Sequence, residues 1–205
     1  DMKVLMINLG PHQKGATNRA LVEVAKGLDE YKVEHEILWV GTDPIQGCID
    51  CKACFKNRRC VFDDLVNTAV EKVRASDGLI LGSPVHYASA ANTLFVDRLF
   101  RVVSKEVALK VGSSVVSCRR GGASATFDQL NKYFTISQML VVSSAYWNSV
   151  HGNNASEVEQ DHEGLQVMRI LGRNMGYVIN RLHGRDVEKP LPEQRVWTNF
   201  ISSER

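Results

Sequence analysis

Apolar residues collect in short runs at intervals along the chain. The runs KVLMIN (3–8) and GLILGS (78–83) are nearly continuous, which is typical of strands buried on both faces. Similar patterns predict three further strands, over 33–40, 111–118 and 139–147. Between the strands the apolar positions follow a helical period, which predicts helices over 17–31, 65–75, about 90–103, about 125–136 and 163–182.

Strands that alternate with single helices imply right-handed crossovers and a parallel sheet covered by helices on both faces. With five strands, the sequence predicts an α/β fold, a flavodoxin-like three-layer sandwich whose five-stranded sheet has the order 2-1-3-4-5. We expect one domain over 1–205. Its tail, 185–205, has two prolines and no helical period, so it should extend over the surface or onto a partner subunit. Trp197 and Phe200 would anchor the tail there, or would only cover the core of their own domain.

Composition narrows the range of partners. The 205 residues are 44% hydrophobic, enough for one compact core, and the formal net charge is +2. Because no run of lysine and arginine exceeds two residues, we expect small-molecule partners and neither nucleic acid nor membrane. The N-terminal DMKVLMINLG has no signal-peptide pattern, and we interpret Asp1, before Met2, as an expression remnant. We therefore expect a cytosolic protein.

The segment NLGPHQKGATN (8–18) joins the first predicted strand to the first predicted helix. Gly10 and Gly15 permit a tight turn with exposed amide N–H groups, and Thr17 stands where a helix N-cap belongs. With the helix dipole, these groups form an anion site that suits a monophosphate. Ala16 replaces the lysine that a triphosphate loop requires, and the dinucleotide motif G-x-G-x-x-G is absent. The alternative is an ordinary strand-to-helix turn with a capping threonine.

Four of the five cysteines lie close together in the sequence: Cys48, Cys51, Cys54 and Cys60. The first three follow at three-residue intervals, a spacing with which one loop can wrap three corners of an iron–sulfur cubane. Zinc, a redox disulfide (Cys51 with Cys54, or Cys48 with Cys60) and no ligand at all are the alternatives. Four basic residues lie among the thiols: Lys52, Lys56, Arg58 and Arg59. They could offset the charge of a cluster or form a solvated loop. We expect Cys118, in an apolar stretch, to be a buried core residue.

Three segments together resemble the NAD(P)H-dependent FMN reductase family of flavodoxin-like proteins: LGPHQKGATN (9–18), GSPVHYASAANTLFVDRL (82–99) and CRRGGASATFDQL (118–130). The cysteine stretch is similar to that of the iron–sulfur flavoprotein branch of this family. The resemblance runs from about residue 3 to about residue 182. It implies that the protein binds FMN and that all four clustered cysteines hold one 4Fe-4S cluster.

The resemblance implies three groups of FMN-binding residues. Around the phosphate would lie Gly10, His12, Gly15, Thr17 and Asn18. Along the isoalloxazine would lie Ser83, Pro84, Val85, His86 and Tyr87. The other side would be closed by Arg119, Arg120, Gly121 and Gly122. The positive charge of the two arginines would stabilise an anionic reduced flavin. His12 replaces a frequent arginine or lysine, so charge compensation would weaken at alkaline pH. Without the resemblance, SPVHY is a plain strand-to-helix connection and the two arginines are solvated charges.

These observations predict an FMN-dependent oxidoreductase that takes electrons from NADH or NADPH and passes them to a small-molecule acceptor. The family resemblance also implies a homodimer or homotetramer. Because the flavin carries the chemistry, we assign no catalytic side chain. Asp161, His151 and Trp147 would line the acceptor pocket or serve as a helix cap and core packing. Two other functions are an electron carrier of the flavodoxin kind, which the near-neutral charge disfavours, and a flavin-free regulatory domain.

Overall fold

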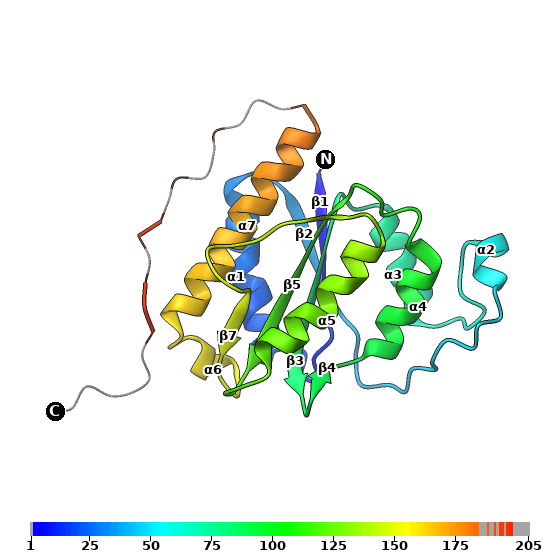
Figure 1. Ribbon diagram of the computed structural model, residues 1–205, viewed down its shortest axis with the longest axis horizontal. Coiled ribbons are helices and arrows are strands. Elements are labelled where there is room, and N and C mark those ends of the chain that lie inside the picture. Colours follow the sequence, from blue (N-terminus) through cyan, green and yellow to red (C-terminus); the bar gives the residue numbers. More distant parts are fainter. Residues whose placement is uncertain (1, 185–187, 189–190, 192, 195, 199–205) are drawn as a thin grey trace.

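The computed structural model describes residues 2–184, 188, 191, 193–194 and 196–198. These residues form a sheet with helices on both faces (Figure 1). Its main strands run parallel in the order β2-β1-β3-β5-β6: β1 (Lys3–Asn8), β2 (Glu34–Trp39), β3 (Gly78–His86), β5 (Val111–Cys118) and β6 (Leu140–Val141). Two short strands are added, β4 (Ser89–Ala90) antiparallel to β3 and β7 (Ser149–His151) parallel to β5. The predicted fold class is confirmed.

The five predicted helices are present, with ends shifted by a few residues. One face of the sheet carries α1 (Ala16–Glu30) and α7 (His162–Leu182), and the other carries α3 (Leu65–Arg74), α4 (Thr93–Val103) and α5 (Ala123–Ile136). Two short helices complete the described chain, α2 (Ala53–Asn57) in the cysteine loop and α6 (Ala155–Val158) before α7. None of the described helices is both long and apolar enough to cross a membrane.

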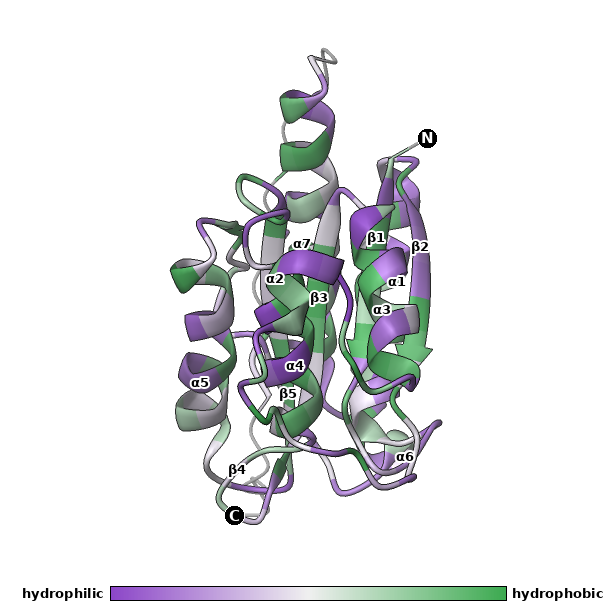
Figure 2. Cartoon of the chain, turned by 90° about the vertical axis from the view of Figure 1, so that its right-hand side faces the viewer, coloured by the Kyte–Doolittle hydropathy of each residue, from purple (hydrophilic) through white to green (hydrophobic). Residues whose placement is uncertain are grey.

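Two hydrophobic cores lie on opposite faces of the sheet. In β1, Val4 and Met6 belong to the core under α1 and α7, whereas Leu5 and Ile7 belong to the core under α3 and α4. Successive residues of a strand point to opposite faces, so a strand covered on both faces must be apolar at every position. Figure 2 shows hydrophobic strands at the centre and hydrophilic residues on the outer helix faces. This double burial explains the continuous apolar runs in the sequence.

Helices α1 and α7 touch at the level of their backbones. A Cβ atom added at Gly172 would lie 2.1 Å from the carbonyl oxygen of Val24, and one added at Gly27 would lie 2.3 Å from the carbonyl oxygen of Arg169. Two glycines thus face each other where the helices cross. This close approach holds the C-terminal half of α1 directly against α7.

The prediction of one continuous fifth strand over 139–147 is wrong. Only β6 (Leu140–Val141) falls within this range; residues 142–148 are irregular, and the strand pairing with β5 resumes at β7, beyond the predicted end. Side chains replace the missing strand ladder there: Ser113 Oγ donates to the carbonyl of Val142 (2.9 Å), and Asn148 Nδ2 donates to Ser113 Oγ and to the carbonyl of Ser114 (3.0 Å each). Polar side chains that bond to nearby backbone compete with regular secondary structure.

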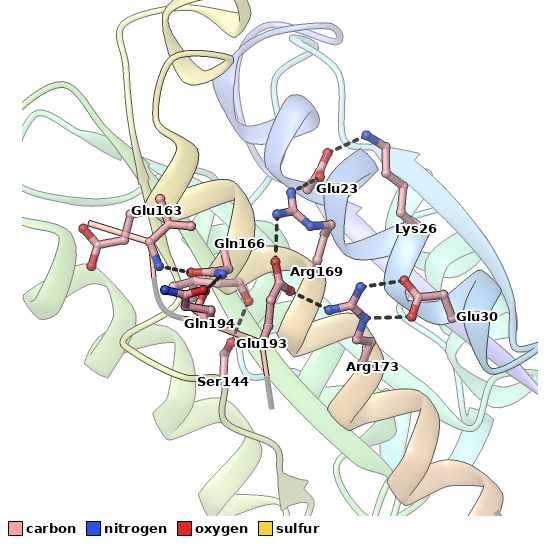
Figure 3. Close-up of polar contacts among 12 residues, drawn as sticks. Glu23, Lys26, Glu30, Ser144, Glu163, Gln166, Arg169, Arg173, Glu193 and Gln194 are labelled. Carbon is pink, nitrogen blue, oxygen red and sulfur yellow. Dashed lines mark hydrogen bonds and ion pairs between the residues drawn. The ribbon is translucent and has the colours of Figure 1, made fainter. Parts of the chain in front are cut away.

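Tail residues 193, 194, 196 and 198 bond to α7 of the same chain, and Figure 3 shows Glu193 and Gln194 among these contacts. Glu193 pairs with Arg173 (2.6 Å) and Arg169 (3.3 Å), and the amide of Val196 donates to Gln166 (2.6 Å). Trp197 is 71% exposed, so it does not cover the core. Phe200, the second predicted anchor, lies outside the described residues.

Candidate functional site

Three side chains fix the loop that follows β1. Asn8, fully buried at the end of β1, accepts a hydrogen bond from the amide of Gly10 (3.0 Å). Trp39 at the end of β2 donates its indole N–H to the carbonyl of Gly10 (2.9 Å), and Asn92, just before α4, donates to the carbonyl of Leu9 (2.7 Å). The turn is therefore held by β2 on one side and by the residue that precedes α4 on the other.

Helix α1 begins at this loop without a side-chain cap. Its N-cap residue is Gly15, so the prediction of Thr17 as the N-cap is wrong. Thr17 lies inside the first turn, 3% exposed, with its hydroxyl 2.9 Å from that of Ser117. The first amide N–H groups of a helix have no acceptor within the helix, and the helix dipole makes that end positive. The arrangement is that of an anion-binding turn.

A pocket at this edge of the sheet brings three loops together. It encloses about 570 Å³, part of it open to solvent. The loop after β1 with the first turn of α1, the end of β3 that leads into its hairpin with β4, and the loop after β5 contribute eight of the predicted flavin-binding residues: Gly10, His12, Gly15, Thr17, Pro84, Val85, His86 and Arg119. The strand order reverses between β1 and β3, which is where an open α/β sheet binds its ligands.

The other six predicted flavin-binding residues are not part of the lining of this pocket in the described structure: Asn18, Ser83, Tyr87, Arg120, Gly121 and Gly122. Two of them shape it from behind. The Ser83 hydroxyl is fully buried and accepts from the amide of Ala91 (2.9 Å). Gly122 has φ 88°, and a Cβ there would lie 2.9 Å from Val85, so glycine lets the second and third loops meet. Tyr87 is fully exposed with φ 61°.

Six further residues line the pocket but were not predicted from the sequence to bind flavin: Pro11, Ala16, Ser117, Cys118, Gly152 and Asn153. Gly152 and Asn153 follow β7, the strand piece that the broken fifth strand places beside the end of β5. The glycine directly after the short strand is the sequence feature that could have indicated a ligand-binding loop at Gly152 and Asn153. Cys118 is 4% exposed, as expected for a core residue, yet it also borders the pocket.

A second pocket lies beside β7 and contains the three residues considered for acceptor binding. Trp147, His151 and Asp161 line a hollow of about 870 Å³, part of it open to solvent, together with Tyr146 and Trp197. The structure therefore brings these three residues together. It also makes Asp161 the N-cap of α7, the alternative role considered for it.

Asp161 and His151 form a coupled pair. One carboxylate oxygen of Asp161 accepts from the amide of Gly164 (2.9 Å), and the other accepts from the amide of His151 (2.6 Å) and lies 3.6 Å from its Nδ1. Asp161, followed by the thiol of Cys118, raises the pKa of His151 to about 10. The imidazole is consequently protonated and positive at neutral pH.

The four clustered cysteines line one pocket on the outer side of α4. It encloses about 350 Å³, part of it open to solvent, and shares no residue with the pocket at the start of α1. All four thiols are free; Cys48 and Cys51 are exposed, while Cys54 and Cys60 are partly buried. Asp50, Lys52 and Arg58 have φ between 50° and 59°, which is unusual for residues with side chains. Such strained turns collect at functional sites.

The thiols do not converge on a single point. Among the described residues, no three His, Cys, Asp or Glu side chains are close enough to share one metal ion. A cubane binds each thiolate at a different iron, so its ligands surround a volume instead of a point. Four cysteines around one hollow therefore fit a cluster better than a single zinc ion.

Comparison with known proteins identifies the family. The family model of NADPH-dependent FMN reductases matches residues 2–154. The chain belongs to this family of FMN reductases. Within the family it falls in the iron–sulfur flavoprotein branch. An iron–sulfur flavoprotein of Methanocaldococcus jannaschii is 29% identical over 188 residues, 87% of this chain and 97% of that protein. One of Methanosarcina thermophila is 32% identical over 157 residues, 73% of this chain and 78% of that protein.

Solved structures support the fold of this FMN reductase family member. The NAD(P)H:quinone oxidoreductase of Methanothermobacter marburgensis superposes with a TM-score of 0.61 at 14% identity, over 85% of this chain and 96% of that one. At this identity the likeness shows a shared fold. The family model is what identifies the protein as a flavin oxidoreductase.

Proposed function

We propose that the protein is an FMN-dependent reductase that takes electrons from NADH or NADPH and delivers them to a small-molecule acceptor. The observation that carries this proposal is the pocket in which three loops meet at the uncapped start of α1. Bound FMN supplies the electron chemistry, because it accepts hydride from a nicotinamide and passes the electrons on.

The residues of the first loop bind the phosphate in this proposal. The amides at the start of α1 donate to it, Arg119 adds positive charge at the pocket wall, and the imidazole of His12 lines the same wall. A Cβ at position 15 would lie 3.0 Å from the Cβ of His12, so a larger residue there would push His12 away from the turn. The second and third loops hold the ring, and the open side of the pocket admits the nicotinamide and the acceptor.

We further propose that Cys48, Cys51, Cys54 and Cys60 hold a 4Fe-4S cluster. Their shared pocket and the names of the relatives in the same branch support this assignment. Such a cluster would supply single-electron transfer. An anaerobic absorption spectrum with iron and sulfide analysis tests it: about four irons per chain are expected, and zinc or no metal in anaerobically reconstituted protein contradicts it.

The flavin site is tested by comparing FMN with riboflavin, which lacks the phosphate. Two charge-assisted hydrogen bonds of about 1.5 kcal/mol each make FMN bind roughly a hundredfold tighter. Ala16→Asp places a negative charge in the first turn of α1, so FMN affinity should fall at least about tenfold. The fold should keep its stability, since an acidic residue suits a helix start. Ala16→Ser is the neutral control. Equal affinities for FMN and riboflavin would refute the phosphate site.

Stopped-flow mixing with NADPH separates the reductase from an electron carrier. A reductase bleaches its flavin absorbance within the time of catalytic turnover, typically well below about one second. A carrier's flavin stays oxidised until a protein donor is added. The net charge of +2 favours the reductase, because carriers use strong negative charge to steer toward basic partners.

A further inference from the structure

A buried arginine on α4 spans the segment that carries the cysteines. The side chain of Arg98 is 1% exposed and pairs with Asp64 through both terminal nitrogens, at 2.6 and 3.0 Å. It also donates to the carbonyl of Gln46 (3.1 Å), and its guanidinium lies 4.9 Å from the ring centre of Phe62. These partners come from residues 46–64, so one guanidinium ties together both ends of the cysteine segment.

The same guanidinium bonds to a cysteine sulfur. Nε of Arg98 lies 3.3 Å and one terminal nitrogen 3.1 Å from Sγ of Cys60. The backbone of Cys60 is fixed as well, because Asn67 accepts from its amide (2.8 Å) and donates to its carbonyl (3.1 Å). Cys60 is thereby held in position by α3 and α4 together.

The neighbouring arginine of α4 provides a contrast. Arg101 also reaches the cysteine segment, pairing with Asp50 (2.5 Å) and stacking on Phe55 (4.9 Å), but its side chain is 42% exposed. Among the described contacts of the cysteine segment, the Arg98 guanidinium is the charged group that hydrogen-bonds to a cysteine sulfur. Burial makes that interaction stronger than an exposed one.

We propose that Arg98 is the positioning residue of the cysteine site: its planar fork fixes the Cys60 sulfur as a ligand, and its charge raises the reduction potential of the cluster. The inference depends on the cluster proposed above. Hydrogen bonds to the sulfurs and nearby charge are known determinants of cluster potential. A positive charge stabilises the reduced, more negative state, so its removal shifts the potential downward.

The test uses anaerobically reconstituted protein and EPR-monitored redox titration. Asp64→Asn keeps the cap of α3, because asparagine caps as well as aspartate. It leaves the Arg98 charge uncompensated, so the potential should rise. Adding Arg98→Met to that variant should lower the reduction potential relative to Asp64→Asn alone. We expect the reduction equilibrium to change at least tenfold, which corresponds to about 59 mV for a one-electron couple. Opposite shifts from two paired residues are not expected of a purely structural pair.

Arg98→Lys separates the effect of the positive charge from the effect of the planar guanidinium. It also provides a test if the double variant does not fold. Lysine keeps the charge but cannot hold Asp64, Gln46 and Cys60 at once. We expect a nearly unchanged potential and faster loss of iron to a chelator. Arg101→Met is the matched control, and its shift should be smaller because Arg101 is exposed.

The outcomes are distinguishable. Suppose that the wild type binds iron but the reduction potential of the cluster is the same in the wild type, in Asp64→Asn and in the double variant. The proposed role of Arg98 is then wrong, and the cluster assignment stands. If the protein binds FMN but no iron, the cluster and the role of Arg98 both fail while the flavin site stands. If Arg98→Lys retains iron as well as the wild type, the positioning role is wrong.

Discussion

At the residue scale, Asp161 keeps the imidazole of His151 protonated at neutral pH. The raised pKa of His151, about 10, exceeds the ordinary value of 6.5. A group whose pKa is raised by folding stabilises the fold fully below its ordinary pKa. That contribution is lost as pH rises from about 6.5 through 10. The pair therefore weakens on the alkaline side.

Asp161→Asn should lower the pKa of His151 by about one unit or more, because the neighbouring negative charge is removed. Asparagine can still cap α7, so the helix should keep its start. An NMR titration of the imidazole ring protons measures the change. An unchanged titration curve would mean that Asp161 does not hold the proton on His151.

Individual side-chain hydrogen bonds between distant parts of the chain could not be predicted from the sequence. The glycines of the first loop were recognisable because a turn restricts residue choice. Asn8, Trp39 and Asn92 were not, since their hydrogen bonds depend on how strands and helices pack. Arg98 offered no signal either: Asp64 and Cys60, its partners, lie 34 and 38 residues earlier.

At the element scale, α1 borders the proposed phosphate site with its first turn and contacts α7 near its other end. Helix α1 is pressed against α7 at Gly27 and Gly172 and cannot shift without opening that contact. The order of strands and helices was predictable from the apolar pattern. Strands buried on both faces give continuous apolar runs, and helices buried on one face give a helical period. The break in the fifth strand was not, since it depends on Asn148 reaching across to the serines of β5.

Gly172→Ala should destabilise the fold by about 3 kcal/mol, the upper range for overpacking, because its Cβ would strike backbone. Chemical denaturation measures the loss. Gly121→Ala is the control, since a Cβ there meets nothing within 4 Å, and should stay within about 0.5 kcal/mol. Similar stability for both variants would show that the helices can separate at little cost.

At the scale of the whole molecule, two arginines of α7 link the tail to α1, because Arg169 and Arg173 pair with Glu193 and also with Glu23 and Glu30. Burial alone would raise the pKa of Glu193, but hydrogen bonds from Gln166, Arg173 and Arg169 lower it below 4.5. A group with a lowered pKa stabilises above its ordinary value, and the effect disappears as pH falls through the lowered pKa. Docking of the tail should therefore weaken in acid.

Glu193→Gln should expose the tail at neutral pH. Hydrogen exchange at the amides of Val196 and Thr198, which are bonded to Gln166 and Glu163, reports docking. We expect about fivefold faster exchange, equivalent to roughly 1 kcal/mol for partly exposed ion pairs. Glu188→Gln removes the same charge from a residue that contacts Tyr31 through its backbone carbonyl, and should leave exchange unchanged. Equal exchange in both variants contradicts the role of Glu193.

The divided fifth strand also affects how copies of the protein meet in solution. A long outer strand offers a row of unpaired N–H and C=O groups on which another chain can add itself, a common route to aggregation. Here the border of the sheet between residues 140 and 151 consists of a two-residue and a three-residue piece separated by a loop. Neither piece is long enough to template an incoming strand, so this interruption disfavours the addition of another chain at this border of the sheet, opposite β2.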